Sequence, residues 1–246
     1  MFAEYELNIL YKDDFLVVIN KPSGLLVHKS MIDRHEIYFA MKILRDQIGQ
    51  WVYPVHRLDK PTSGVLLFAL DSESARIMSE QFLQKSIQKS YFAVVRGYTE
   101  QNGIINHALQ EKLDKLSDKN ASANKEAQEA ITEYERVATV ELDFAVGRYD
   151  CVRYSLVKLM PRTGRKHQLR RHMKHISHHI LGDTKYGRGE HNKFIRKQYG
   201  VHRLLLHCAS LHVTHPYSGK TLVFRAEFDD VFTKLFKEFD WKVKDI

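Results

Sequence analysis

The segment His56–Gly64 places one carboxylate, Asp59, among cations at a point where the chain turns. Arg57 and Lys60 flank Asp59, and positive neighbours keep an aspartate ionised and nucleophilic. The same residue types also suit a purely structural role, because an aspartate that precedes Pro61 and a Thr-Ser-Gly run commonly closes a turn or caps a helix. Spacing alone therefore leaves Asp59 as either a nucleophile or a turn residue.

Positive charge is concentrated in the stretch 151–182, which contains no acidic residue. The chain carries 38 Lys and Arg against 30 Asp and Glu, a formal net charge of +8, and this stretch alone holds eight of the cations. An apolar spacing runs through the same stretch, which favours a folded surface over a tail. A polyanion such as RNA is the expected partner, although a merely solvated basic face gives the same pattern. The eight cations are Arg153, Lys158, Arg162, Arg165, Lys166, Arg170, Arg171 and Lys174.

Histidines and cysteines give no convincing metal site. The histidines His172, His175, His178 and His179 are close in sequence, but no matching carboxylate or thiolate motif accompanies them. The two cysteines, Cys151 and Cys208, lack the spacing of a zinc site and are expected to be buried thiols. We therefore expect no bound metal.

The elements that must position these residues follow from apolar patterning and turn residues. Asp59 should lie just before a buried strand, and Gly49 and Ser72 should end one helix and cap the next. Expected strands are Leu7–Tyr11, Phe15–Asn20, Val65–Leu70, Tyr91–Val95, Ala130–Val140, Val152–Met160 and Leu222–Phe228. Expected helices are His35–Ile48, Ser72–Gln84 and Arg165–Ile176.

Many strands with a few helices, not in strict alternation, predict an α+β fold with a mixed, largely antiparallel sheet. The stretch 111–129 is charged and poor in large apolar residues, so we expect an exposed insertion that could divide the chain into two lobes. No apolar run reaches the roughly 18 residues that a membrane span requires, and the N-terminal residues do not resemble a secretory signal. The expected location is the cytoplasm.

The whole segment His56–Gly64 resembles the signature of the large pseudouridine synthase family, which modifies ribosomal and transfer RNA. Three further segments match that family in the right order: Lys21–Gly24, Lys89–Gly97 and Thr163–Arg170. Leu181–Asp183 and Leu204–Cys208 also match, so that the resemblance runs from about residue 7 to residue 228. It implies the fold of that family, in which helices flanking the sheet form two lobes around a catalytic cleft.

The resemblance implies that Asp59 is the nucleophile, that Tyr91 packs against uracil and takes the proton from carbon 5, and that Arg170 pairs with the aspartate. Arg57 would fill the space that the flipped base leaves. Without the resemblance, we would interpret Tyr91 as a core residue and Arg170 as a solvated cation. Isomerisation of uridine involves no net redox change or hydrolysis, so no cofactor is expected. The residues expected to bind RNA beside Arg57 are Arg165, Lys166, His167 and Gln168.

The layout of the chain indicates which class of RNA is the expected substrate. Only twenty residues precede Lys21, where many relatives that modify ribosomal RNA carry an S4-type RNA-binding domain. We therefore expect one catalytic domain over 1–246, with no separate S4 domain and no obligatory protein partner. The compact layout, the insertion Leu113–Lys119 and the run Gly164–His172 resemble the transfer RNA branch of the family, which implies uridine 65 in the acceptor stem.

Three alternatives stay open. Within the family, the substrate could be a uridine of large-subunit ribosomal RNA. Outside it, the chain could be a non-catalytic RNA-binding protein that keeps the fold, although a pure binder has no use for a carboxylate, Asp59, that faces phosphates. A metal-dependent nuclease is the weakest alternative, because no cluster of carboxylates is evident.

Overall fold

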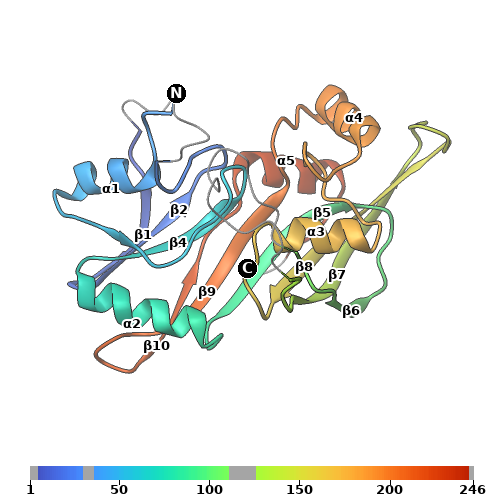
Figure 1. Ribbon diagram of the computed structural model, residues 1–246. Coiled ribbons are helices and arrows are strands. Elements are labelled where there is room, and N and C mark those ends of the chain that lie inside the picture. Colours follow the sequence, from blue (N-terminus) through green and yellow to red (C-terminus); the bar gives the residue numbers. More distant parts are fainter. Residues whose placement is uncertain (1–4, 30–35, 111–125, 244–246) are drawn as a thin grey trace.

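One ten-stranded sheet runs through the computed structural model, which describes residues 5–29, 36–110 and 126–243 (Figure 1). The strands are β1 (Asn8–Lys12), β2 (Leu16–Lys21), β3 (Tyr53–Pro54), β4 (Ser63–Ala69), β5 (Gln88–Arg96), β6 (Asn102–Asn106), β7 (Ile131–Leu142), β8 (Val152–Pro161), β9 (Leu206–Thr214) and β10 (Thr221–Arg225). The helices are α1 (Ala40–Ile48), α2 (Ser72–Leu83), α3 (Gln168–His175), α4 (Gly189–Tyr199) and α5 (Asp230–Glu238).

The order of the strands along the sheet is β1-β2-β4-β9-β5-β8-β7-β6, with β10 paired to β9 and β3 paired to β4. β4 and β9 run parallel, whereas the other strand pairs are antiparallel. The expected α+β class with a mixed, largely antiparallel sheet is therefore confirmed.

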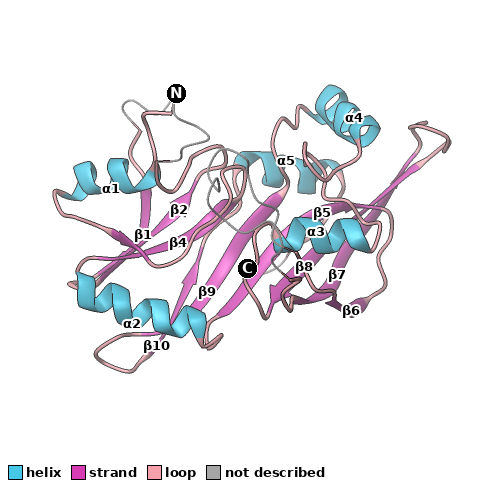
Figure 2. Ribbon diagram, viewed as in Figure 1, coloured by secondary structure: helices cyan, strands magenta, loops and turns pink. Residues whose placement is uncertain are grey.

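Helices cover both faces of the sheet, and β5 shows how the sequence achieves this (Figure 2). Tyr91, Ala93 and Val95 belong to the hydrophobic core that also contains residues of α3, whereas Phe92 and Val94 belong to the core that contains α5. Successive side chains of a strand point to opposite faces, so an apolar run without alternation fits a strand that is covered on both sides. The strand expected at Tyr91–Val95 is confirmed.

Strand β4 is buried along its whole length and lies directly beside β9. Gly64 makes this approach possible, since a Cβ at that position would lie 2.1 Å from the carbonyl oxygen of Cys208. Its φ of 111° is also a conformation that side-chain-bearing residues rarely adopt. A glycine at the start of β4 therefore fixes the strand that follows Asp59.

Several expected element boundaries differ from those in the structure. α1 begins at Ala40, and Phe39 is extended, so residues 36–39 are not helical as expected. Gly49 ends α1 in a left-handed conformation, as predicted. The cap of α2 is Asp71 and not Ser72, because the Asp71 carboxylate accepts the Ser74 N–H.

The ends of two later elements also differ from those expected. α3 begins at Gln168 instead of Arg165, since the chain at His167 takes a left-handed conformation with φ of 55°. β10 ends at Arg225, short of the expected Phe228, before the chain enters α5.

Other predictions lie outside or at the margin of what the structure describes. Of the expected insertion, 111–125 lies outside the described residues, and 126–129 is exposed.

The sequence did not predict five of the elements, namely β3, β6, β9, α4 and α5. No helix in the described part of the chain is long and apolar enough to cross a membrane.

Candidate active site

Asp59 lies in the connection between β3 and β4, where its carbonyl oxygen accepts the N–H of Thr62 at 2.9 Å. The turn that the sequence suggested is therefore present. The backbone closes this turn, which leaves the carboxylate available for other partners. That carboxylate is 21% exposed, so it is sheltered by protein yet open to an entering group.

The segment Lys21–Gly24 holds this turn from one side. The ammonium of Lys21 donates to the carbonyl oxygens of Pro22, Leu25 and Lys60 at 2.8, 2.8 and 3.2 Å. The N–H of Gly24 also donates to the Lys60 oxygen, at 2.8 Å. Burial and, to a smaller extent, the charge of Arg203 lower the pKa of Lys21 to about 7, while the charge of Asp59 opposes the shift. Lys21 was assigned no role from sequence beyond its family match, because its acceptor at Lys60 lies on another segment.

A second set of hydrogen bonds fixes the start of β4. Arg203 Nη2 donates to the Ser63 hydroxyl at 2.9 Å, and that hydroxyl lies 2.8 Å from His207 Nδ1. His207 Nε2 must carry the proton because its partner, the Ala226 carbonyl oxygen at 3.0 Å, can only accept. Burial lowers the pKa of His207 to about 4, so its neutral ring accepts from Ser63. Two residues that follow Asp59, Lys60 and Ser63, are thus anchored to distant segments.

Arg170 joins Asp59 to a second, buried carboxylate. Its Nη1 donates to Asp59 Oδ2 at 3.0 Å, while Nε and Nη2 donate to the two oxygens of Asp183 at 2.8 and 2.9 Å. The Arg170 side chain is 7% exposed, so it is not the solvated cation that its residue type alone suggested. Although burial opposes the charge, the hydrogen bonds and charges of Asp183 and Asp59 raise the pKa of Arg170. A permanent cation therefore faces Asp59.

His167 and Tyr186 complete the surroundings of Asp59. His167 Nε2 lies 3.8 Å from Asp59 Oδ2, and its Nδ1 lies 3.0 Å from the Tyr186 hydroxyl. Burial lowers the pKa of His167, whereas the Asp59 charge acts in the opposite direction. The Tyr186 ring also lies 5.2 Å from the guanidinium of Arg170, within the range of a cation–π contact. Tyr186 therefore contacts two of the groups that face Asp59.

Tyr91 reaches the same region from β5, where it lies opposite Cys208 and Leu159 in the neighbouring strands. It is 9% exposed. Burial raises its pKa, as do the thiol of Cys208 and the charge of Asp59. The phenol is accordingly protonated at neutral pH, and it lies within the electrostatic reach of Asp59.

Comparison with known proteins places this arrangement in a family. Residues 15–175, about two thirds of the chain, match the family model described as RNA pseudouridylate synthase. The chain belongs to this family. It is therefore an isomerase of uridine in RNA. Asp59, Tyr91 and Arg170, which the fold brings into one region, come from three of the segments through which the sequence resembles the family.

Curated relatives match over nearly their whole length. The chain is 50% identical over 239 residues to tRNA pseudouridine synthase C of Vibrio parahaemolyticus, which covers 97% of each chain. It is 53% identical over 240 residues to the Haemophilus ducreyi protein of the same name, covering 98% of each. Among solved structures, Human RNA Pseudouridylate Synthase Domain Containing 4 superposes with a TM-score of 0.70 at 26% identity, over 95% of this chain and 93% of that one.

The remaining residues expected to bind RNA have different surroundings in this pseudouridylate synthase fold. Arg57 is exposed, Lys166 is half-buried, and Arg165 donates to the Glu129 carbonyl oxygen at 3.0 Å. Gln168 is buried, and its amide bonds to Thr163, to Thr132 and to the backbone of residues 131 and 165. This placement gives Gln168 a structural role in holding the turn before α3, with no surface open to RNA.

The basic stretch 151–182 is also less uniform than its sequence suggests. Arg153 pairs with Glu141 and Arg162 pairs with Glu133, across the β7–β8 ladder. Because these carboxylates lie outside the stretch, counting only the charges within it overstated how much of its positive charge lacks an ion pair. The surface that carries the surplus positive charge must therefore be located from the contacts in the structure and not from the sequence.

A metal is not indicated by the described residues, which contain no group of three His, Cys, Asp or Glu side chains able to hold one. His172 bonds instead to the Thr132 hydroxyl and the His107 carbonyl oxygen, at 2.9 and 3.0 Å. The ring of His175 stacks on that of His107 with 3.7 Å between centroids.

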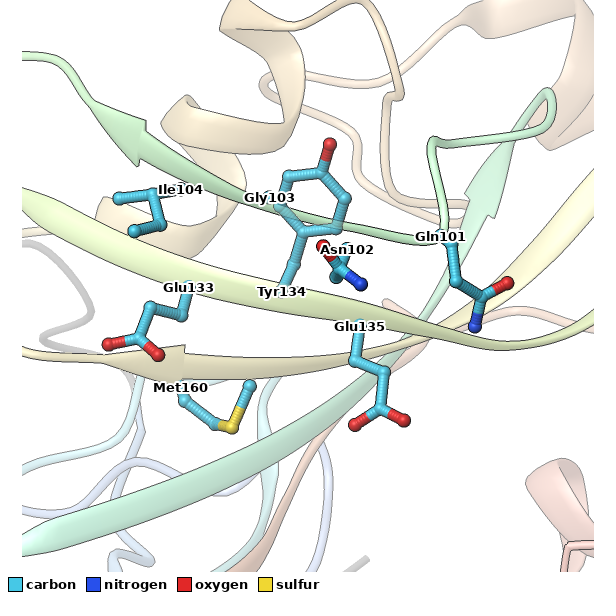
Figure 3. Close-up of a pocket in the computed structure, with 8 residues that line it drawn as sticks. All are labelled: Gln101, Asn102, Gly103, Ile104, Glu133, Tyr134, Glu135 and Met160. Carbon is cyan, nitrogen blue, oxygen red and sulfur yellow. The ribbon is translucent and has the colours of Figure 1, made fainter.

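A pocket of about 380 Å³ opens at the edge of the sheet, lined by residues 101–104 and by Glu133, Tyr134, Glu135 and Met160 (Figure 3). β7 lies four strand positions from β4 in the sheet order, which corresponds to roughly 19 Å at the usual spacing of strands. The carboxylates in the pocket would repel phosphates. We do not assign the pocket to the site around Asp59.

Proposed function

We propose that this chain converts a uridine of transfer RNA, uridine 65 in the acceptor stem, to pseudouridine, with Asp59 as nucleophile. The observation that carries the proposal is the Asp59 carboxylate, held 3.0 Å from the buried Arg170 in a turn that is braced from two sides. Relatives named tRNA pseudouridine synthase C, about half identical over nearly the whole chain, support transfer RNA as the substrate. The reaction would take place in the cytoplasm.

The reaction needs an ionised carboxylate more than any other group. The bond between N1 of uracil and C1′ of ribose breaks, the uracil turns, C5 bonds to C1′, and the proton of C5 leaves while N1 gains one. No oxidant, water or cofactor is consumed. Asp59 adds to the base or assists at the sugar, and either role requires a negative charge, which Arg170 stabilises.

Tyr91 and Arg57 act on the base and on the space it leaves. A uridine within folded RNA must leave its stack to reach Asp59, at a cost of a few kcal/mol. Arg57 is exposed and two residues from Asp59, so it is placed to enter the vacated position. Tyr91 offers the flipped uracil a ring to pack against. Since its raised pKa keeps the phenol protonated, it can take the C5 proton only as it gives up its own.

The nucleophile assignment is tested with Asp59→Asn in a purified reaction on unmodified transfer RNA. We expect binding within about threefold of wild type and no detectable pseudouridine, because the amide keeps the shape but loses the charge. Asp46→Asn is the matched control, since Asp46 is an exposed aspartate of α1 that pairs with Arg45, and it should act like wild type. Product formed by Asp59→Asn at a near wild-type rate would refute the assignment.

The substrate assignment is tested separately by mapping pseudouridines in RNA from a deletion strain, with and without the added gene. The proposal expects loss and return of one modification at transfer RNA position 65. A change confined to ribosomal RNA would reject transfer RNA while leaving the role of Asp59 intact.

A further inference from the structure

Four cations gather beyond the far end of α3, and together with Tyr149 they form what we call the α3-end surface: Arg96, Arg148, Lys174 and Arg188. They come from the end of β5, the β7–β8 turn, the last turn of α3 and the start of α4. In Figure 1 the β7–β8 turn and α4 lie at the same end of the molecule as the last turn of α3. Two of the four lie outside both the family motifs and the basic stretch of the sequence.

Arg96 is held by a neutral partner instead of a carboxylate. Its Nε donates to His191 Nε2 at 3.0 Å, and His191 Nδ1 lies 3.0 Å from the Tyr154 hydroxyl. Since Nε2 accepts a hydrogen bond, the proton of the ring is on Nδ1 and the imidazole is neutral. Burial, assisted by Arg96, lowers the pKa of His191 to about 4, which agrees with this state. The guanidinium is thus fixed in place without loss of its charge.

Tyr149 collects a second guanidinium beside the first. Arg148 lies 5.1 Å and Arg96 lies 5.8 Å from the centre of its ring. Arg148 Nη2 also donates to the Tyr149 hydroxyl at 2.9 Å. Tyr149 is 45% exposed, so the two guanidiniums and the ring lie at the surface of the protein. Like charges are brought together here by a neutral ring.

The other two cations lie around the same point. The connection after α3 brings Lys174 near Arg96, because the Arg96 N–H donates to the His179 carbonyl oxygen at 2.9 Å and the Ser177 N–H donates to the Lys174 carbonyl oxygen at 3.0 Å. Arg188 is the N-cap of α4, the helix whose His191 accepts from Arg96. Burial and the charges of all three cations lower the pKa of His179.

Carboxylates are also present in this region: a backbone hydrogen bond and the charges of Arg188 and Arg96 lower the pKa of Glu190, and Asp143 and Asp150 belong to the β7–β8 turn. In the described part of the chain none of the four cations lies within 4.0 Å of a carboxylate oxygen, in contrast to Arg153, Arg162 and Arg170. The four cations of the α3-end surface are therefore held without ion pairs.

We propose that the α3-end surface binds the sugar–phosphate backbone of the RNA arm that carries the target uridine. This inference rests on the proposed function, because it takes transfer RNA as the partner. Arg170 and Lys174 are four residues apart on α3, about 6 Å along the helix axis, so the surface begins about one helical turn from the site around Asp59. An RNA helix with one base flipped toward Asp59 continues beyond that site and reaches the α3-end surface. The planar guanidinium groups of arginines there can donate two hydrogen bonds to the oxygens of a phosphate.

Such contacts position an RNA without reading its sequence. The α3-end surface would hold the arm in register while the base turns, and it would add affinity that falls with salt. It would not change the chemistry at Asp59. The expected signature is therefore weaker binding with unchanged turnover at saturating RNA.

The test compares two double variants that remove the same charge. Arg148→Ala with Lys174→Ala removes two unopposed cations, whereas Arg76→Ala with Lys85→Ala removes two cations that are paired with Glu73, Glu80 and Glu129. The dissociation constant of an unmodified transfer RNA transcript is measured at several salt concentrations, and kcat is measured at saturating RNA. Binding is read directly, so it does not depend on whether product forms.

We expect the Arg148 and Lys174 double variant to bind about tenfold more weakly, with its slope of log K against log salt reduced by roughly 0.9 for each phosphate that is no longer neutralised. Its kcat should match wild type, and the Arg76 and Lys85 control should keep both affinity and slope. Wild-type affinity and slope in the first variant, or an equal weakening in the control, would overturn the proposal. Failure of the proposed function would appear differently, as a wild-type protein that makes no pseudouridine in transfer RNA.

Discussion

At the scale of single residues, Asp59 is controlled by partners that are themselves held by others. Arg170 faces it at 3.0 Å and is locked by Asp183. His167 lies 3.8 Å away and bonds to Tyr186, whose ring also contacts Arg170. Tyr186 thus positions both neighbours of the carboxylate without touching it.

The two contacts of Tyr186 can be separated by substitution. Tyr186→Phe removes the hydrogen bond to His167 but keeps the ring beside Arg170, so we expect kcat to fall about fivefold, the effect of about 1 kcal/mol. Tyr186→Leu removes both contacts, and we expect kcat to fall about tenfold or more, since the cation–π contact is worth about 0.5–2 kcal/mol in addition. KM for transfer RNA should change little in either variant.

Steady-state rates on transfer RNA check this order, with circular dichroism to confirm that both variants fold. Equal losses of activity in the two variants would place the whole effect on the hydroxyl. Unchanged rates in both would show that Tyr186 has no influence on the site around Asp59.

The sequence could indicate some of these residues and not others. The ion pair between Asp59 and Arg170 was implied by the family resemblance of both segments, and the structure contains it. Lys21 and Tyr186 carried no such assignment, because their roles depend on which distant atoms they meet. Gln168 was expected to face RNA, yet its amide is used up within the protein. Residue type alone does not reveal whether a polar side chain is already satisfied.

At the scale of elements, the turn at Asp59 depends on the parallel contact between β4 and β9. Gly64→Ala would place a Cβ 2.1 Å from the Cys208 carbonyl oxygen, where backbone must move. We expect the free energy of unfolding to fall by more than about 3 kcal/mol, since both backbone strain and a clash contribute. Urea unfolding measures this decrease.

Gly219→Ala is the matched control, because Gly219 has a φ of 67° but nothing within 4 Å of its Cβ position. It should cost only about 1 kcal/mol, the strain of the left-handed conformation alone. A destabilisation in Gly64→Ala no greater than that of the control would contradict the close packing of β4 on β9.

Elements with a clear period were predictable, and those without one were not. The run 65–70 is apolar throughout and forms the core of β4. β9 was missed because it mixes His, Cys and Ser with apolar residues while both of its faces are buried. α5 was missed although its signal is present: Phe232, Leu235 and Phe236 are buried at helical spacing behind the cap Asp229. The cap of α2 lies one residue earlier than expected, at Asp71, whereas α1 and α3 begin later than expected behind residues that make no side-chain cap.

At the scale of the whole molecule, one continuous sheet brings together, around the turn at Asp59, segments that are far apart in sequence. Two points of that assembly are fixed by histidines that accept hydrogen bonds and must stay neutral. His207 anchors the start of β4, and His191 anchors Arg96 near α4. Burial lowers the pKa of each to about 4. Acid should therefore weaken both anchor points together.

The sign of this effect follows from proton uptake. An unfolded chain restores each histidine to its ordinary pKa near 6.5, so between that value and about 4 the unfolded state binds more protons than the folded state. Stability is thus full above about pH 6.5 and falls as the pH drops toward 4.

Each protonated ring should lower the free energy of unfolding by about 2 kcal/mol between pH 7.5 and pH 5. Urea unfolding at the two pH values measures these losses together with that of His56, whose pKa burial lowers to about 3. His207→Asn should be less stable than wild type at pH 7.5 but lose less on acidification, whereas His202→Asn, at an exposed position, should keep the full wild-type loss. An equal acid loss in wild type and His207→Asn would show that His207 is not the neutral anchor of β4.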